Sequence, residues 1–173
     1  MKVILYMAMS INGYIATEDG NEDFLSHENW NTFCKLAPKC GAFIVGRKTY
    51  EAVQSWTEGY TYDDVDAIRI VVSRNKSYEI GSSYLLATSP ENALDICKQK
   101  GLNEVILTGG SSLNSEFMRR NLVDEIIVNI EPFVLGKGIK IFADNDWETE
   151  LELVNIKELP SKIVQLCYKV KKD

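Results

Sequence analysis

A pair of adjacent glycines, Gly109 and Gly110, follows an apolar run and precedes a serine-led segment. The apolar residues 105–107 suit a buried strand, and the residues from Ser111 onward suit a helix. A helix that begins just after glycines presents free backbone N–H groups and the positive end of its dipole, and both attract phosphate. Ser111 or Ser112 could cap this helix or donate a hydrogen bond to a phosphate oxygen. Taken alone, the segment is explained as well by an ordinary strand-to-helix turn.

Two further strand ends carry groups that suit phosphate. Gly46-Arg47-Lys48-Thr49 follows the apolar residues 42–45 and brings backbone amides, two cations and a hydroxyl group to the start of a helix. Two such helix starts facing one crevice would hold a pyrophosphate from both sides. Ser73 and Arg74 follow another apolar run, and their hydroxyl and guanidinium groups suit a phosphomonoester such as the 2′-phosphate of NADPH.

Each of these cationic groups also has an ordinary explanation. Arg47 and Lys48 would equally form a solvated helix face, and Ser73-Arg74 an ordinary charged turn. If Arg74 does bind a 2′-phosphate, a charge-assisted hydrogen bond of about 1.5–3 kcal/mol predicts a roughly ten- to hundredfold preference for NADPH over NADH. The chain has no G-x-G-x-x-G sequence, which argues against a standard Rossmann dinucleotide site.

Length, charge and cysteine content limit the classes of protein to consider. The 173 residues suit one domain spanning 1–173, and a net charge of −6 argues against a nucleic-acid partner. The chain begins with a strand-like run and has no apolar stretch near the ~18 residues of a membrane span, so we expect neither a signal peptide nor a membrane protein. Four cysteines without C-x-x-C spacing and a single histidine, His27, make a zinc site or a histidine-dependent hydrolase improbable. We expect reduced thiols in a cytoplasmic protein.

The elements that must position these groups alternate between strand and helix. Apolar runs predict strands, and N-cap and glycine signals predict helices between them, one of which begins at residue 27 and ends at Pro38. After residue 125 the strands follow one another without helices, and residues 148–158 and 162–170 predict a β-hairpin. We therefore predict an α/β fold of three layers, with a mostly parallel central sheet, helices on both faces and an antiparallel C-terminal hairpin.

Four segments in the same order resemble motifs of the dihydrofolate reductase superfamily. These segments are Ala8–Ala16, Gly46–Glu51, Val71–Arg74 and Thr108–Leu113. Two later runs, Leu122–Glu125 and Pro132–Gly138, resemble the reductase domain of bacterial riboflavin biosynthesis, and above all small stand-alone proteins related to that domain. The resemblance covers about residues 2–170 and implies a dihydrofolate-reductase-like fold with bound NADPH.

The resemblance also implies which residues bind the cofactor. The backbone of Ala8 and Ile15 would hold the nicotinamide carboxamide, and Gly20 would lie in a mobile loop that closes over it. Ser73 and Arg74 would take the 2′-phosphate. The residues that would bind the pyrophosphate are Gly46, Arg47, Lys48, Thr49, Thr108, Gly109, Gly110, Ser111, Ser112 and Leu113.

The catalytic group is not identified by the resemblance. A folate reductase uses a carboxylate near the start of its first helix, but the Trp-x-x-Pro sequence that usually precedes it is missing here. Asp23 or Glu28 lies in that region, although neither falls in a matching motif, and a first-turn glutamate such as Glu28 is equally explained as a partner of the helix dipole. Riboflavin-type reductases often have glutamate where this chain has Thr108. Side chains that would line a substrate pocket, or else pack in the core, are Asp23, Trp30, Phe33 and Tyr50.

Together these features predict an NADPH-dependent reductase that transfers a hydride to a small pterin- or aminopyrimidine-like substrate. The alternatives are an NADPH-binding module without turnover and a true dihydrofolate reductase. A flavin-binding protein is a third possibility, which would give a yellow preparation. The resemblance and the apolar C-terminal strands also suggest a homodimer.

Overall fold

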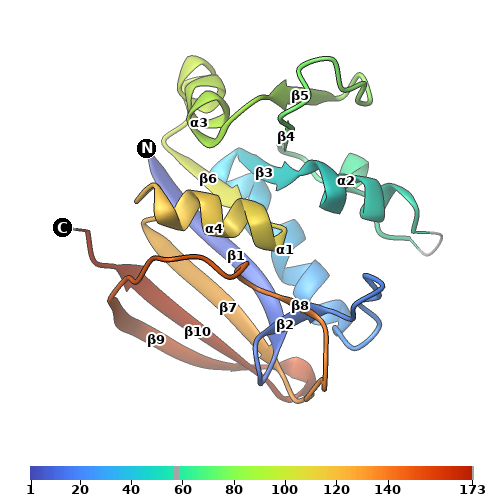
Figure 1. The fold of residues 1–173 in the computed structure, drawn as a ribbon, viewed down its shortest axis with the longest axis vertical. Coiled ribbons are helices and arrows are strands. Elements are labelled where there is room, and N and C mark those ends of the chain that lie inside the picture. The colour runs from blue at the N-terminus through green and yellow to red at the C-terminus, as the bar shows by residue number, and fades with distance from the viewer. Residues whose placement is uncertain (57–58, 173) are drawn as a thin grey trace.

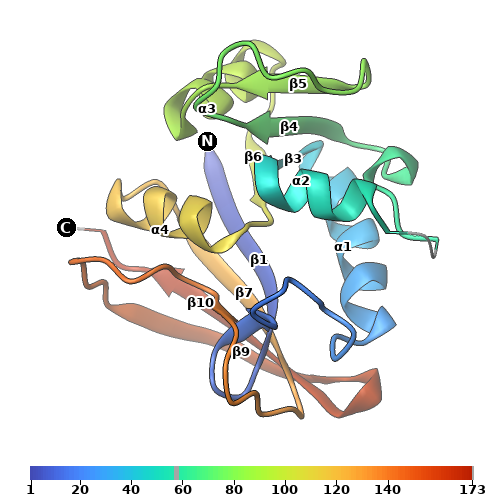
Figure 2. The same ribbon diagram turned by 45° about the vertical axis from the view of Figure 1, so that its right-hand side comes forward.

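An eight-stranded sheet organises the computed structural model, which describes residues 1–56 and 59–172. Its strand order is β5-β4-β3-β6-β1-β7-β10-β9, as Figures 1 and 2 show. Six strands are parallel: β1 (Lys2–Ser10), β3 (Ala42–Gly46), β4 (Ile68–Val72), β5 (Tyr84–Ala87), β6 (Glu104–Leu107) and β7 (Glu125–Glu131). At one edge the hairpin of β9 (Leu151–Leu159) and β10 (Ile163–Val170) runs antiparallel to β7. The predicted fold class is thereby confirmed.

Helices cover both faces of the parallel strands. On one face α1 (His27–Cys40) and α2 (Arg47–Gln54) pack on a core that includes Ile4 and Tyr6 of β1. On the other face α3 (Pro90–Gln99) and α4 (Ser111–Arg119) pack on a core that includes Val3 and Leu5. Because successive side chains of β1 point to opposite faces and both faces are buried, the strand is apolar almost throughout.

Shorter elements complete the chain. The strand β2 (Tyr14–Ala16) pairs with β8 (Ile139–Lys140) beside the C-terminal end of β1, and two 3₁₀ turns span Tyr62–Asp64 and Pro160–Lys162. Within the described ranges, no helix has the length and apolar character needed to cross a bilayer.

The first helix differs from the sequence-based prediction at its C-terminus. The prediction that Pro38 ends the helix was wrong, because α1 continues through Pro38 to Cys40. Proline lacks an N–H donor and so costs the helix one backbone hydrogen bond, but Ala37 and Cys40 on either side of Pro38 are buried in the core, and this packing stabilises the last turn. The helix ends instead at Gly41, whose φ of 81° is left-handed and whose N–H donates to the carbonyl oxygen of Ala37.

Candidate active site

The two glycine junctions lie side by side at the carboxyl ends of β3 and β6. The Gly46 N–H donates to the carbonyl oxygen of Gly109 with an N–O distance of 2.6 Å. A Cβ atom on Gly110 would lie 2.8 Å from Thr49 Oγ1, closer than side chains pack, so the backbone of α4 and the side chain of α2 meet at this point. The peptide bond between Gly109 and Gly110 is cis. Two helix N-termini from opposite faces of the sheet therefore open at one place.

The first turns of both helices keep their backbone donors unoccupied by side chains. The N-cap residues are Gly46 for α2 and Gly110 for α4, and neither makes a side-chain cap hydrogen bond. Ser111 and Ser112 are therefore the first helical residues of α4, so of the two roles considered for them, capping the helix is excluded and donation to a phosphate remains. The first N–H groups of a helix have no intrahelical acceptor, so these two turns present donors to an anion.

The cations of α2 lie beside this point. The Arg47 guanidinium lies over the ring of Tyr78, 5.6 Å from its centroid, and its Nε is 3.7 Å from Glu51 Oε1. The Tyr78 hydroxyl donates to the same carboxylate at 2.9 Å, which fixes the arginine stem against α2. Lys48 is exposed on the first turn of α2, and Leu113 is partly buried one turn into α4.

The third predicted phosphate segment follows the neighbouring strand. Val72 of β4 pairs with Gly46 of β3, so Ser73 and Arg74 begin the turn next to the start of α2. Ser73 is buried and its Oγ accepts a hydrogen bond from the Asn75 N–H at 3.2 Å, whereas Arg74 is exposed. All three predicted segments thus lie along one edge of the sheet, because the carboxyl ends of parallel strands share that edge.

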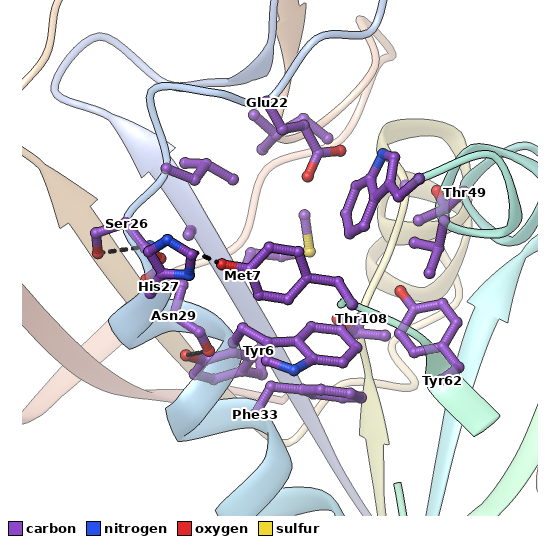
Figure 3. A pocket seen from close by; sticks show the side chains of 18 of the residues that line it. Tyr6, Met7, Glu22, Ser26, His27, Asn29, Phe33, Thr49, Tyr62 and Thr108 are labelled. Carbon is purple, nitrogen blue, oxygen red and sulfur yellow. Dashed lines mark hydrogen bonds between the residues drawn. The ribbon is translucent and has the colours of Figure 1, made fainter. Parts of the chain in front are cut away.

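A cavity of about 760 Å³ extends from the glycine junctions towards α1 (Figure 3). Thr49, Thr108 and Gly110 line its end nearest the junctions, and Ala8 of β1 and Ile15 of β2 also line it. Its volume falls in the range that suits a drug-sized ligand. Gly20 does not line the cavity and takes a φ of 87° in the loop after β2, a conformation that favours glycine.

The far end of the cavity has aromatic walls. Trp30 lies 5.6 Å from Phe33, 5.4 Å from Tyr60 and 5.8 Å from Tyr62, measured between ring centroids. Trp56 continues this wall, 6.1 Å from the ring of Tyr60. Such an arrangement offers flat apolar faces to a planar ring. Two of the predicted pocket residues, Trp30 and Phe33, therefore line the cavity.

Tyr50, the third aromatic candidate, belongs to the core instead. Its side chain is buried against Tyr84, with the ring centroids 4.8 Å apart, and its hydroxyl accepts a hydrogen bond from the Gly81 N–H at 3.2 Å. Because Tyr50 is on the face of α2 that turns towards β5, it does not line the cavity. Of the two roles considered for Tyr50, core packing is therefore the one that the structure shows.

A buried polar network supports the floor of the cavity. Asn129 Nδ2 donates to the Tyr6 hydroxyl at 2.9 Å and to Asn29 Oδ1 at 2.7 Å, while Asn129 Oδ1 accepts from Gln165 at 2.9 Å. Burial raises the pKa of Tyr6 well above its ordinary value, so this hydroxyl stays protonated and donates to the Asn29 carbonyl oxygen. Sequence reasoning missed the network, although polar residues inside the strand at 125–131 were a signal for it.

Glu131 ends this network at the start of α1. Its carboxylate is 2% exposed and accepts hydrogen bonds from the Ser26 N–H and Oγ, both at 3.0 Å, and from the Asn29 side-chain amide. The negative charge thus lies at the positive end of the helix dipole, where it stabilises the helix. Ser26 and Asn29 are held in place, and both line the cavity.

The carboxyl groups that line the cavity do not include Glu28, the catalytic candidate from the sequence. Glu28 does not line the cavity; its Oε1 accepts a hydrogen bond from Thr32 Oγ1 at 3.5 Å along the helix surface. Asp23 and Glu22 do line the cavity, from the loop that precedes α1. The Glu22 carboxylate points into the cavity in Figure 3, and burial raises its pKa to about 7. The sequence did not indicate Glu22, because its burial depends on the conformation of the loop between β2 and α1.

The described fold is that of dihydrofolate reductase. The solved structure of Enterococcus faecalis dihydrofolate reductase, complexed with NADP(H) and RAB-propyl, superposes with a TM-score of 0.72 at 19% identity and covers 99% of this chain and 97% of its own. A Shewanella sp. PV-4 protein assigned to riboflavin biosynthesis superposes with a TM-score of 0.84 at 22% identity, covering 99% and 100% of the two chains. The predicted dihydrofolate-reductase-like fold is confirmed.

Sequence comparison narrows the class to one family. Residues 1–165 match the RibD C-terminal domain, and the chain belongs to that family. The Bacillus subtilis (strain 168) protein YwjB is 31% identical over 170 residues, covering 96% of this chain and 97% of YwjB. The 2,5-diamino-6-ribosylamino-4(3H)-pyrimidinone 5′-phosphate reductase of Methanothermobacter thermautotrophicus is 25% identical over 173 residues, covering 78% of this chain and 79% of that protein.

Proposed function

We propose that this protein is an NADPH-dependent reductase that transfers a hydride to a small pterin- or aminopyrimidine-like ring. One observation carries the proposal: the two glycine junctions touch, with Gly46 N 2.6 Å from the oxygen of Gly109, at one end of a cavity whose other end is aromatic. The family is one of NADPH-dependent pyrimidine reductases, which supports the same assignment.

The residues at the junctions fit the pyrophosphate of a dinucleotide. Any side chain at position 110 would collide with Thr49 Oγ1, so a glycine is needed to keep the backbone open to a ligand there. Amides from the first turns of α2 and α4 would bind the phosphates, helped by Thr49, Ser111 and Ser112. Ser73 and Arg74, next to the start of α2, would hold the 2′-phosphate.

The middle of the cavity would hold the nicotinamide against the substrate. Backbone groups of Ala8 and Ile15 would bind the carboxamide, as the family resemblance implies. NADPH supplies a hydride when it is bound. The protein would orient the acceptor ring between Trp30, Phe33 and Tyr62 and would exclude water from it.

Reduction of a ring C=N bond also needs a proton. A carboxyl group with a pKa of about 7 is half protonated at neutral pH and is suited to donate, so Glu22 is our candidate for the acid. Asp23 is the second carboxyl that lines the cavity. The α1 residue Asn29 lines the cavity, and its side-chain amide is hydrogen-bonded to Ser26 and Asn129. A folate reductase would use a free carboxylate in this region of the first helix. The amide at Asn29 therefore favours a ring other than dihydrofolate.

A paired titration with NADPH and NADH tests the cofactor assignment. Binding would be followed by thermal shift and by quenching of Trp30 and Trp56, which both line the cavity. We expect NADPH to bind roughly ten- to hundredfold more tightly than NADH. Arg74→Ala should abolish this difference, whereas Arg119→Ala, an exposed arginine on α4, should retain it. Failure of both nucleotides to bind at millimolar concentration would refute the proposal.

Turnover is tested separately, by NADPH consumption with dihydropterins, dihydrofolate and 2,5-diamino-6-ribosylamino-4(3H)-pyrimidinone with and without its 5′-phosphate. Oxidation of NADPH with any ring acceptor excludes a module that binds the cofactor without chemistry. Tight NADPH binding without consumption on any of these rings would instead favour that module.

A further inference from the structure

The two ends of the cavity differ in the charged groups that line them. The junction end adjoins the phosphate-suited turns of α2 and α4, with Arg47 and Lys48 beside them. At the aromatic end, the described lining residues include the carboxyl groups of Glu22 and Asp23 and the imidazole of His27, but no lysine or arginine. A phosphate buried there would lack a cationic partner, and burying an unpaired charge is strongly unfavourable.

The helix N-terminus at the aromatic end is already occupied by a protein carboxylate. Helix α1 begins at the cavity wall, and its dipole would otherwise favour an anion there. Glu131, 2% exposed, takes that place by accepting from the Ser26 N–H and Oγ, each at 3.0 Å. The chain's own carboxylate therefore lies at this helix N-terminus, where it would repel a phosphate.

The nearest cations belong to the other end. Arg47 is held by the Glu51 carboxylate and the Tyr78 ring, and neither Arg47 nor Lys48 lines the cavity. The carboxylates of Glu22 and Asp23 are the anionic groups among the described residues that line this end, and they stand beside aromatic ring faces. The Glu22 carboxylate projects into the cavity, with the rings of Phe33 and Tyr62 on the opposite side (Figure 3).

We propose that the aromatic end accepts a planar heterocycle that carries no phosphate and that turns amino or protonated ring N–H groups towards Glu22 and Asp23. Ring faces attract electron-poor or cationic rings, and carboxylates accept hydrogen bonds from amino groups. This inference rests on the proposed function, because it assigns the junction end to the cofactor. The proposed substrate thus differs from that of the Methanothermobacter relative, whose name specifies a 5′-phosphate.

The test compares one ring with and without a phosphate. The probes are 2,5-diamino-6-ribosylamino-4(3H)-pyrimidinone and its 5′-phosphate, titrated into protein saturated with NADP⁺ so that the cofactor's phosphate sites are filled. The titration is made at pH 8, above the pKa of about 7 of Glu22, so that this carboxyl is mostly ionised. We then expect the phosphorylated probe to bind roughly 30-fold more weakly, the effect of one like charge about 8 Å away at an effective dielectric constant of about 20. Quenching of Trp30 and Trp56 reports binding without requiring turnover.

Two variants check that the charge of the cavity causes the preference. Glu22→Lys places a cation in the aromatic end and should reverse the order of the two probes, and Glu22→Gln should narrow the gap. Glu18→Lys makes the same charge change at an exposed position of the same loop that does not line the cavity, and should leave the order unchanged. Thermal unfolding of each variant verifies that it is folded.

The outcomes separate this inference from the proposed function. If NADP⁺ binds and the phosphorylated probe binds as tightly as the other, or if neither probe binds at millimolar concentration, the inference is overturned and the cofactor assignment stands. If NADP⁺ itself does not bind, the proposed function fails. The same pair of probes, titrated into nucleotide-free protein, then still decides whether the aromatic end rejects a phosphate.

Discussion

The Glu22 carboxyl should make the stability of the folded chain fall as the pH rises. Burial raises its pKa in the folded state from an ordinary value of 4.5 to about 7. Between these two values the folded state binds more protons than the unfolded state, so the free energy of unfolding decreases with increasing pH and levels off above pH 7. Below pH 4.5 both states hold the proton and the penalty is absent.

The size of this effect follows from the pKa difference. A difference of about 2.5 pKa units, at 1.36 kcal/mol for each unit, corresponds to about 3 kcal/mol between pH 4.5 and pH 8. Glu22→Gln keeps the shape of the side chain and removes the titrating group. The unfolding free energy of the natural chain minus that of the variant should therefore fall by about 3 kcal/mol across this range. All other ionisable groups are present in both proteins, so their contributions cancel in the difference.

Urea unfolding at pH 4.5, 5.5, 6.5 and 8, without added nucleotide, measures this difference. Glu18→Gln, which removes an exposed carboxylate from the same loop, is the matched control and should follow the natural chain at every pH. A difference between the natural chain and Glu22→Gln that stays constant within about 0.5 kcal/mol would refute the reasoning. It would mean that the carboxylate is hydrated and that the loop does not bury it in solution.

Three further predictions address the cofactor end, the network and the oligomeric state. Gly110→Ala should weaken NADPH binding at least tenfold in the fluorescence titration, because its Cβ would lie 2.8 Å from Thr49 Oγ1, whereas Gly136→Ala, with no atom within 4 Å, should not. Asn129→Ala should lower the free energy of unfolding in urea by about 2–4 kcal/mol, because buried partners lose their hydrogen bonds; a loss below 1 kcal/mol would contradict the network's role. We propose a homodimer that covers the apolar side chains of the edge strand β9, so Ile156→Lys, at a residue 59% exposed, should shift the chain to monomer in sedimentation analysis; a chain that is already monomeric would contradict this.

The order and kind of the elements could be predicted from the sequence. Fully apolar runs such as 42–45 and 105–107 have the character of strands buried on both faces, and the glycines after them fix where helices begin. These are local properties, set by hydrophobic patterning and by the backbone freedom of glycine. The strand at 84–87 and the Ser89 cap of α3 are placed where local signals put them. The juxtaposition of three phosphate-suited turns also follows, because parallel strands end at one edge.

Tertiary structure alone decided which side chains face the cavity. Glu22 and Glu28 belong to the same stretch of sequence, yet Glu22 lines the cavity and Glu28 does not, because Glu22 lies in the loop before α1 and Glu28 contacts Thr32 along the helix. The contact between Ser26 and Glu131 joins residues 105 positions apart, and no local pattern encodes such a pairing. Tyr50 packs on β5 rather than in the cavity for the same reason. Packing between distant segments determines which side chains are buried, and therefore the pKa of a buried carboxyl group. Strand and helix formation depends mainly on the local sequence.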